Sequence, residues 1–395
     1  MVNAAWTGRI KAIIAGLGLG LALVMSINWW NIYAYHVPNC STENCVADFV
    51  AIYAQSLLIW EHPTALYDVN QQAAYQKRIA PIERELPSPY PPFAILFHAP
   101  VAFLSFSNAF FAFTLVNIIL LGSVIWRLCR DLRLSNDQRQ WLLLFALCSF
   151  GVQAALSNSQ SSIIVLYFFT SHLLALRRGK EFRAGIWAGM LSFKPQYLAL
   201  PLFLLLIDRR RRGFTIGVLV AAGLTVAPFL LLGQQTLLQY LQIIRLVGTE
   251  NSWINPLAAM HNLKALTGVW LPPSWRYVAW FGSAVLVFSG IVWLNVRARR
   301  LAKGFEACWI GNSLALLLLT PHLFAHDLSL LIVPCALLLS LCGTQVPIWL
   351  GLGLIGVGVI PAINYFLPTI MAASLATLFV LSLFLVRKNL PLASA

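Results

Sequence analysis

Charged side chains are scarce in this chain, and acidic ones are the scarcest. Of 395 residues, 10% are charged and only 13 are Asp or Glu, whereas ordinary soluble domains carry about 25% charged residues. Together with a hydrophobic content of 59% and a mean hydropathy of +0.76, this excludes a soluble enzyme. It predicts an all-α polytopic membrane protein. The sequence has no soluble domain, low-complexity tract or obvious repeat, so residues 1–395 are predicted to form one transmembrane domain.

The few carboxylates are also not clustered. Magnesium and calcium sites are built from several oxygen ligands, most of them carboxylates, and zinc sites need three or four ligands in good geometry. The pair His322 and His326 has a spacing that zinc can use, but it supplies only two ligands. We therefore expect no metal requirement and no other cofactor.

The 27 Lys and Arg residues give a formal charge of +14, but their positions argue against a nucleic-acid partner. Most lie in short groups at the ends of apolar segments. These groups are Arg9 and Lys11; Arg127, Arg130, Arg133 and Arg139; Arg177, Arg178, Lys180 and Arg183; residues 209–212; Arg297, Arg299, Arg300 and Lys303; and Arg387 and Lys388. Short basic loops stay on the cytoplasmic side of a membrane. The distribution predicts a multi-pass membrane protein, surrounded by lipid, with both termini cytoplasmic.

Apolar segments between these groups predict about twelve transmembrane helices. The first, residues 12–32, is long enough to span and is followed by no small-residue cleavage pattern, so we expect an uncleaved span. Two outward loops are long, residues 34–108 and 233–276. Within the first, residues 94–104 are too few to cross, and we expect them at the membrane interface.

Residues 184–208 lie between two basic groups that must both be cytoplasmic, so this segment is predicted to go out and return. Two helices of about 10 residues reach only ~15 Å, which puts the turn at residues 193–196 at mid-membrane depth. A charge there costs at least ~2.5–3.5 kcal/mol, so Lys194 is a functional candidate that needs an anion. Asp208 lies at the cytoplasmic end, and no other span shows an interior acid. A phosphate is favoured over a structural ion pair.

The run at residues 46–60 has helical periodicity, with Phe49, Tyr53 and Trp60 on one side and Asp48 and Gln55 on the other. This pattern predicts a helix on the membrane surface with the carboxylate turned up or inward. Asp48 also suits a plain role as a cap or first-turn acid of that helix.

Two further outward positions carry polar groups. The corner at residues 320–328 holds His322, His326 and Asp327, and the turn at residues 157–162 holds Asn158 and Gln160. The histidines suit contact with a phosphate or sugar, or hydrogen bonding within an interface. Turn chemistry accounts for Asn158 and Gln160 about as well as ligand contact does.

The cysteines divide into two kinds. Cys40 and Cys45 flank a polar turn of the first outward loop, where an oxidising compartment would allow a disulfide, although two residues do not make a framework. Of the other five, Cys129 lies in a predicted cytoplasmic loop. Four lie in or beside apolar segments and are interpreted as small hydrophobic residues: Cys148, Cys308, Cys335 and Cys342.

These candidates come from four separate parts of the chain and are all predicted to face outward. A carboxylate, a buried cation, amides and imidazoles suit transfer from a lipid-linked phosphate. In that chemistry a carboxylate removes the proton of the acceptor hydroxyl, and cations stabilise the charge of the leaving phosphate.

At these residues the chain resembles the polyprenyl-phosphate-dependent glycosyltransferases of the GT-C class, and most of all glycosyltransferase family 87. The resemblance is an ordered series of short motifs: ADF (47–49), YPPF (90–93), NSQSS (158–162), FKPQ (193–196) and PHLFAHDL (321–328). It implies a GT-C-like helical bundle with juxtamembrane helices in the first outward loop. It also implies an extracytoplasmic active site, a polyprenyl-phosphate-linked sugar donor, and Asp48 as general base.

The sequence thus predicts an inverting glycosyltransferase that moves mannose or a pentofuranose from polyprenyl phosphate to a glycolipid or polysaccharide acceptor. Asp48 would be the base, and Lys194, His322 and His326 would bind the donor phosphate. The residues expected to position sugar or acceptor are Gln55, Tyr90, Asn158, Gln160, Gln196 and Asp327.

The main alternative is a transporter or lipid-carrier flippase, since twelve spans and a broken helix pair also occur in transporters. The absence of two matching six-span halves, the long first outward loop and the one-sided clustering of polar groups argue against it. A non-catalytic assembly partner would require the Asp48 side chain to face lipid or loop packing.

Overall fold

The computed structural model describes residues 2–31, 48–80, 86–248, 257–298, 301, 303–363 and 369–388. Within these ranges every regular element is a helix and no β-strand occurs, which confirms the all-α prediction. The N-terminal half comprises α1 (Val2–Asn31), α3 (Asp48–Glu61), η2 (Pro63–Ala65), α4 (Val69–Ile79), α5 (Pro92–His98), η3 (Ala99–Phe103), α6 (Phe106–Asp131), α7 (Asn136–Cys148), α8 (Phe150–Ser157), α9 (Ser162–Arg177), α10 (Glu181–Met190), η4 (Leu191–Phe193) and η5 (Pro195–Tyr197). The C-terminal half comprises α11 (Ala199–Ile207), α12 (Arg211–Leu232), α13 (Gln234–Gly248), η6 (Leu257–Ala259), α14 (Leu263–Trp270), α15 (Pro273–Ala298), α16 (Gly304–Leu319), η7 (Ala325–Leu331), α17 (Ile332–Leu341), α18 (Ile348–Ile363) and α19 (Ile370–Lys388).

The apolar helices differ greatly in length. Among the described residues, α6, α12 and α15 are each long and apolar enough to cross a membrane, and the pair α7 and α8 qualifies jointly although it bends by 54°. Most remaining apolar helices have 10–17 residues. The fold is therefore a membrane bundle in which many segments are short or broken, and the count of about twelve crossings stays a prediction.

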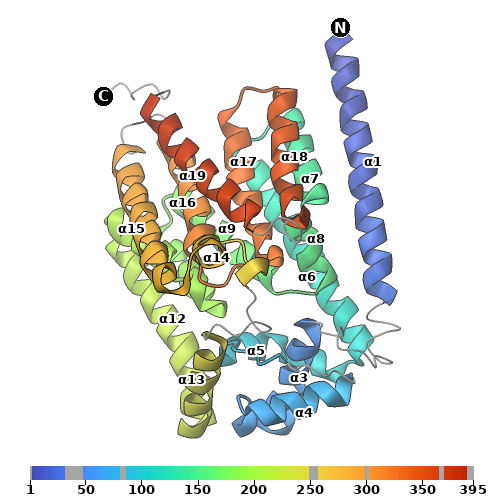
Figure 1. Ribbon diagram of the computed structural model, residues 1–395, viewed down its shortest axis with the longest axis vertical. Coiled ribbons are helices and arrows are strands. Elements are labelled where there is room, and N and C mark those ends of the chain that lie inside the picture. Colours follow the sequence, from blue (N-terminus) through green and yellow to red (C-terminus); the bar gives the residue numbers. More distant parts are fainter. Residues whose placement is uncertain are drawn as a thin grey trace.

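A layer of short helices covers one end of the bundle (Figure 1). It consists of α3, α4, α5 and α13, and it lies opposite the end at which α1 begins and α19 ends. Ion pairs join helix ends and connectors of the bundle: Lys11 with Asp137, Arg178 with Asp131, and Arg177 with Glu306 at 3.1 Å. Three residues of the predicted basic groups, Lys11, Arg177 and Arg178, therefore bind acids of the bundle itself.

Helix α3 is covered by protein on both sides, so its predicted position at the membrane surface stays a prediction. Ten of its residues are buried, and they occupy both sides of the helix; Phe49 is fully buried and Gln55 is 2% exposed. The helices α4 and α5 pack on it, and Phe49 stacks on aromatic rings of α6. The first outward loop therefore covers α3 with its own helices, α4 and α5. The periodicity of α3 alone does not predict this cover.

The predicted broken hairpin is present. Helix α10 has 10 residues and α11 has 9, and the single turns η4 and η5 interrupt them at residues 191–197. Helix α10 packs very closely on α12, because Gly185 and Gly189 face Gly213 and Gly217. A Cβ on Gly185 would lie 2.3 Å from the Gly213 carbonyl oxygen. Small residues at four-residue spacing allow such close approach of membrane helices, and here they fix the hairpin to a spanning helix.

We expect Gly185→Ala to lower the thermal unfolding temperature of the detergent-purified protein. Overpacking costs about 1–3 kcal/mol, and since the obstacle is backbone, side-chain rotation does not relieve it. This exceeds the about 1 kcal/mol that alanine gains over glycine in a helix. Gly223→Ala, on α12 with nothing within 4 Å of the added Cβ, is the control and should be at least as stable as the parent. Equal stability of both variants would contradict the close packing.

Candidate active site

A cavity of about 230 Å³ opens between the layer of short helices and the bundle. Its described lining comes from α3, the extended segment before α5, the turn before α9, the hairpin break, the end of α13 and the corner between α16 and η7. The lining residues are Asp48, Ala51, Leu86, Pro87, Ser88, Pro89, Tyr90, Pro91, Gln160, Phe193, Lys194, Pro195, Gln196, Val247, His322, Phe324, His326 and Asp327. Asp48 therefore faces a cavity and not lipid, and it shares that cavity with Lys194.

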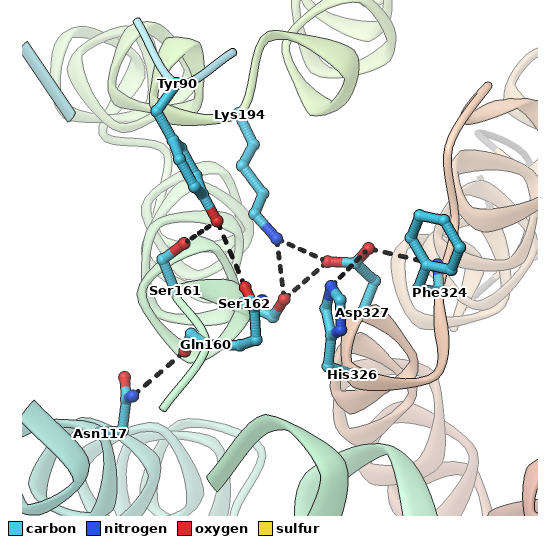
Figure 2. Close-up of polar contacts among 9 residues, drawn as sticks. All are labelled: Tyr90, Asn117, Gln160, Ser161, Ser162, Lys194, Phe324, His326 and Asp327. Carbon is cyan, nitrogen blue, oxygen red and sulfur yellow. Dashed lines mark hydrogen bonds and ion pairs between the residues drawn. The ribbon is translucent and has the colours of Figure 1, made fainter. Parts of the chain in front are cut away.

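Lys194 is bound to an acid of another element (Figure 2). Its Nζ lies 2.9 Å from Asp327 Oδ1 and donates to Ser162 Oγ at 3.0 Å, while Ser162 Oγ donates to the same Asp327 oxygen at 2.6 Å. Lys194 is 7% exposed, and Asp327 is 2% exposed. The expectation that no interior acid reaches Lys194 is wrong, because the non-helical corner before η7 brings Asp327 into the bundle.

Local backbone geometry places both partners. Lys194 is extended between η4 and η5, with φ −127° and ψ 92°, and Pro195 begins the next turn. Since the residue before a proline disfavours helical angles, the Lys-Pro pair keeps the hairpin open at this point. Asp327 lies in the first turn of η7, and its Oδ2 accepts the Phe324 backbone N–H at 3.4 Å. Asp327 thus caps its own helix while it binds Lys194.

An ammonium group has three N–H donors, and the two bonds to Asp327 and Ser162 leave one for a ligand. The described lining carries two carboxylates, Asp48 and Asp327, and one ammonium. An anion in the cavity therefore meets a full positive charge only at Lys194. The ion pair fixes that charge in one position, which lowers the cost of orienting it when a ligand binds.

The turn before α9 holds a second polar network. Tyr90 Oη donates to Gln160 Oε1 at 3.2 Å and lies 2.8 Å from Ser161 Oγ, and Asn117 Nδ2 donates to the Gln160 carbonyl at 3.1 Å. Ser159 adopts a left-handed conformation with φ 45°, which is uncommon for a residue other than glycine. The turn is therefore constrained, and it holds the Gln160 side chain at the cavity.

Both histidines of the corner line the cavity. His326 Nε2 lies 3.5 Å from Asp327 Oδ2. Burial lowers the pKa of His322 below its usual value, and Lys264 lowers it further while Asp327 opposes this. His322 is therefore neutral at pH 7. It would reach a phosphate through a ring N–H and not through a charge.

Not every predicted site residue reaches the cavity. Gln196 lines it, but Gln55 and Asn158 do not. The Gln55 amide is used by Ser88, and Asn158 Nδ2 donates to the Ala154 carbonyl at 2.9 Å at the end of α8. Cys40 and Cys45 fall outside the described residues, so their predicted disulfide stays a prediction.

Part of the lining was not among the predicted site residues. Residues 86–89 form an extended part of it, and Ser162 bridges the ion pair. The sequence contains a sign of each. The prolines at positions 87, 89, 91 and 92 prevent a helix before α5, and Ser162 belongs to the polar turn at residues 157–162. Among the described residues, no group of three or more His, Cys, Asp or Glu side chains could hold a metal ion.

The chain matches the model of a known protein family. The model of glycosyltransferase family 87 matches residues 89–321, which is more than half of the chain. The match includes Tyr90, Gln160 and Lys194, while Asp48 lies 41 residues before it and His326 and Asp327 lie 5 and 6 residues after it. No curated protein matches.

The buried ion pair predicts a double-mutant result. Lys194→Met and Asp327→Leu should each lower the free energy of unfolding by about 3–5 kcal/mol, because each leaves an unpaired buried charge. The double variant should recover most of that loss, since an apolar pair replaces both charges. Arg78→Ala breaks the exposed pair with Glu61 and should change stability by less than about 1 kcal/mol. Denaturant unfolding in detergent measures all four; additive losses in the double variant would contradict the pairing.

Proposed function

The chain belongs to glycosyltransferase family 87, a family of the GT-C class of membrane glycosyltransferases, and on that basis we propose its reaction. It moves mannose or a pentofuranose, with inversion at the anomeric carbon, from a polyprenyl-phosphate donor to a glycolipid or polysaccharide acceptor. One observation carries this proposal: a carboxylate and a buried ammonium, Asp48 and Lys194, line the same cavity although 146 positions separate them in the chain.

Lys194 and the corner histidines bind the phosphate of the donor. Lys194 has one N–H that Asp327 and Ser162 do not use, and this N–H donates to the phosphate. Neutral His322 supplies a further hydrogen-bond donor. As the bond from the anomeric carbon to the phosphate oxygen breaks, its electron pair leaves with the phosphate. A fixed ammonium stabilises this growing charge more strongly in a water-poor cavity than in bulk water.

Asp48 removes the proton of the acceptor hydroxyl. The acceptor oxygen forms its bond to the anomeric carbon on the face opposite the phosphate, which inverts that carbon. Alignment of acceptor, sugar and phosphate in one cavity contributes a large share of the rate, and proton transfer to Asp48 becomes important as the new bond forms. The leaving phosphate is part of the donor, so the reaction needs no cofactor.

The remaining polar lining groups bind sugar hydroxyls. Gln160, Gln196 and Tyr90 supply amide and phenol groups around the space between Asp48 and Lys194, and such groups orient a ligand in a cavity that is otherwise apolar. Asp327 acts through Lys194 and His326.

The proposed side of reaction is the extracytoplasmic face of the bacterial cytoplasmic membrane. Its support is the placement of the cavity next to the layer of α3, α4, α5 and α13, opposite the end at which α1 begins (Figure 1). Basic loops mark the cytoplasmic side, and Arg9 and Lys11 lie near the start of α1.

We expect Asp48→Asn to reduce turnover by about 10²–10⁴-fold while binding of undecaprenyl phosphate is unchanged. The assay combines purified protein, polyprenyl-phosphate-linked mannose or arabinofuranose, and the lipid extract of cells lacking this chain as acceptor source, with mass spectrometry of the glycolipids. Asp68→Asn is the matched control, because Asp68 only caps α4 through the Asn70 and Gln71 backbone N–H groups.

Near-normal turnover in Asp48→Asn would remove Asp48 as the base. Labelled lipid that crosses the membrane of vesicles without a new glycosidic bond would instead favour a flippase.

We expect Lys194→Ala to weaken binding of undecaprenyl phosphate by about 10–100-fold, because a hydrogen bond to a charged group contributes about 1.5–3 kcal/mol. Titration of the lipid phosphate against intrinsic tryptophan fluorescence measures it. The double variant Lys194→Met/Asp327→Leu is expected to recover most of its stability and should show the same loss of binding, which separates binding from stability. Lys180→Ala, at an exposed helix start distant from the cavity, is the control. Unchanged affinity in the double variant would contradict phosphate binding by Lys194.

A further inference from the structure

Side chains of two helices hold one wall of the cavity in place. This wall is the extended segment of residues 86–91, with the sequence Leu-Pro-Ser-Pro-Tyr-Pro. Proline has no backbone N–H, so only Leu86, Ser88 and Tyr90 carry one. All six residues of the segment line the cavity.

Two glutamines of α4 pair with the backbone of this wall as a neighbouring strand would. Gln76 Nε2 donates to the Leu86 carbonyl at 2.8 Å, and the Leu86 N–H donates back to Gln76 Oε1 at 2.9 Å. The Ser88 N–H donates to Gln72 Oε1 at 2.9 Å, and Gln72 Nε2 lies 3.4 Å from the Ser88 carbonyl. The spacing fits, since four residues of a helix rise ~6 Å and two residues of an extended chain rise ~6.6 Å.

A third glutamine joins the wall to the helix that carries Asp48. Gln55 Nε2 donates to the Ser88 carbonyl at 2.8 Å, and Ser88 Oγ donates to Gln55 Oε1 at 2.7 Å. Asp48, Ala51 and Gln55 follow i, i+3, i+7 spacing and share one face of α3, and the first two line the cavity. The wall therefore lies along the face of α3 at whose end Asp48 is placed.

These contacts are deeply buried and fully paired. Gln72 is 1% exposed, and Gln55 and Gln76 are each 2% exposed. The Tyr67 hydroxyl, from the turn between η2 and α4, donates to the Tyr90 carbonyl at 2.6 Å. Buried polar networks of this kind rigidify what they hold, so the wall keeps a fixed position relative to Asp48.

We infer that this wall is the acceptor subsite, and that Gln72 and Gln76 are positioning residues that set its distance from Asp48. The inference rests on the proposed function. A general base must lie within hydrogen-bonding reach of the hydroxyl that it deprotonates, so the acceptor sugar lies beside Asp48 and hence against this wall. Proline rings and Tyr90 offer an apolar face to a sugar ring. The phosphate-binding groups lie on other elements, the hairpin break and the corner before η7.

A preformed wall matters for affinity because ordering a loop on binding costs free energy. Loss of one glutamine amide should therefore weaken the acceptor complex and leave the donor complex intact. This separates acceptor positioning from phosphate binding in a single set of variants.

The experiment measures turnover of Gln72→Ala and Gln76→Ala in the assay described above. The lipid extract of cells lacking this chain is titrated as acceptor source, and binding of undecaprenyl phosphate is measured in parallel. The half-saturating amount of extract should rise about tenfold per variant, as expected for a lost hydrogen-bonded pair, with kcat and lipid-phosphate affinity within about twofold of the parent. Gln76→Glu keeps the acceptor for the Leu86 N–H and should show a smaller rise.

Gln138→Ala is the control for a purely structural effect. Gln138 is also a buried glutamine, 5% exposed, and its amide donates to the Leu339 carbonyl at 2.7 Å, away from the cavity. Gln138→Ala should lower the unfolding temperature about as much as Gln72→Ala and Gln76→Ala do, without a change in the half-saturating amount of extract.

Three results overturn the inference. Two of them are weaker lipid-phosphate binding in Gln72→Ala and Gln76→Ala, and an unchanged requirement for extract in these variants. An equal rise in Gln138→Ala also overturns it, because the effect would then be general. If the parent protein transfers no sugar, the inference fails together with the proposed function. If Asp48→Asn stays active, the assignment of the base fails and the inference fails with it, because that assignment places the acceptor beside Asp48. If Asp48→Asn is inactive while Gln72→Ala and Gln76→Ala need no more extract, the inference alone fails.

Discussion

The ion pair between Lys194 and Asp327 is the interaction on which the site depends. Each charge alone would be costly at this degree of burial, and the pair with Ser162 satisfies both. It also joins the hairpin break to the corner before η7 and to the start of α9, three elements that the chain order keeps apart. The pair therefore sets the position of a positive charge and closes the bundle around the cavity at once.

The cavity has two sides with different physical character. Toward the bundle lie charged and imidazole groups on short, interrupted helices, whose positions follow from close helix packing such as that of Gly185 on Gly213. Toward the layer of short helices lies a wall of prolines fixed by glutamine amides. A lipid-borne phosphate suits the first side and a sugar acceptor the second, with Asp48 next to the wall.

Sequence reasoning was most reliable where one physical cost dominated. The cost of a mid-membrane charge singled out Lys194, and the length of 25 residues between two basic groups predicted the broken hairpin. It failed where several elements had to be known together. No interior acid was expected to reach Lys194, and the helices that cover α3 were not foreseen, because neither an ion-pair partner nor a covering layer can be inferred from one segment.

The sequence by itself determined the membrane class, the helical content, the break at Lys194 and the family, because hydropathy, charge placement, proline and short ordered motifs are local properties. Only the tertiary structure decided which acid pairs with Lys194, that Gln55 binds a proline-rich wall and not a ligand, and that Asp48 faces a cavity. Those outcomes depend on which side chains meet across elements far apart in the chain. Whether the burial of a polar group is costly depends on whether a hydrogen-bonding or charged partner from another element lies beside it.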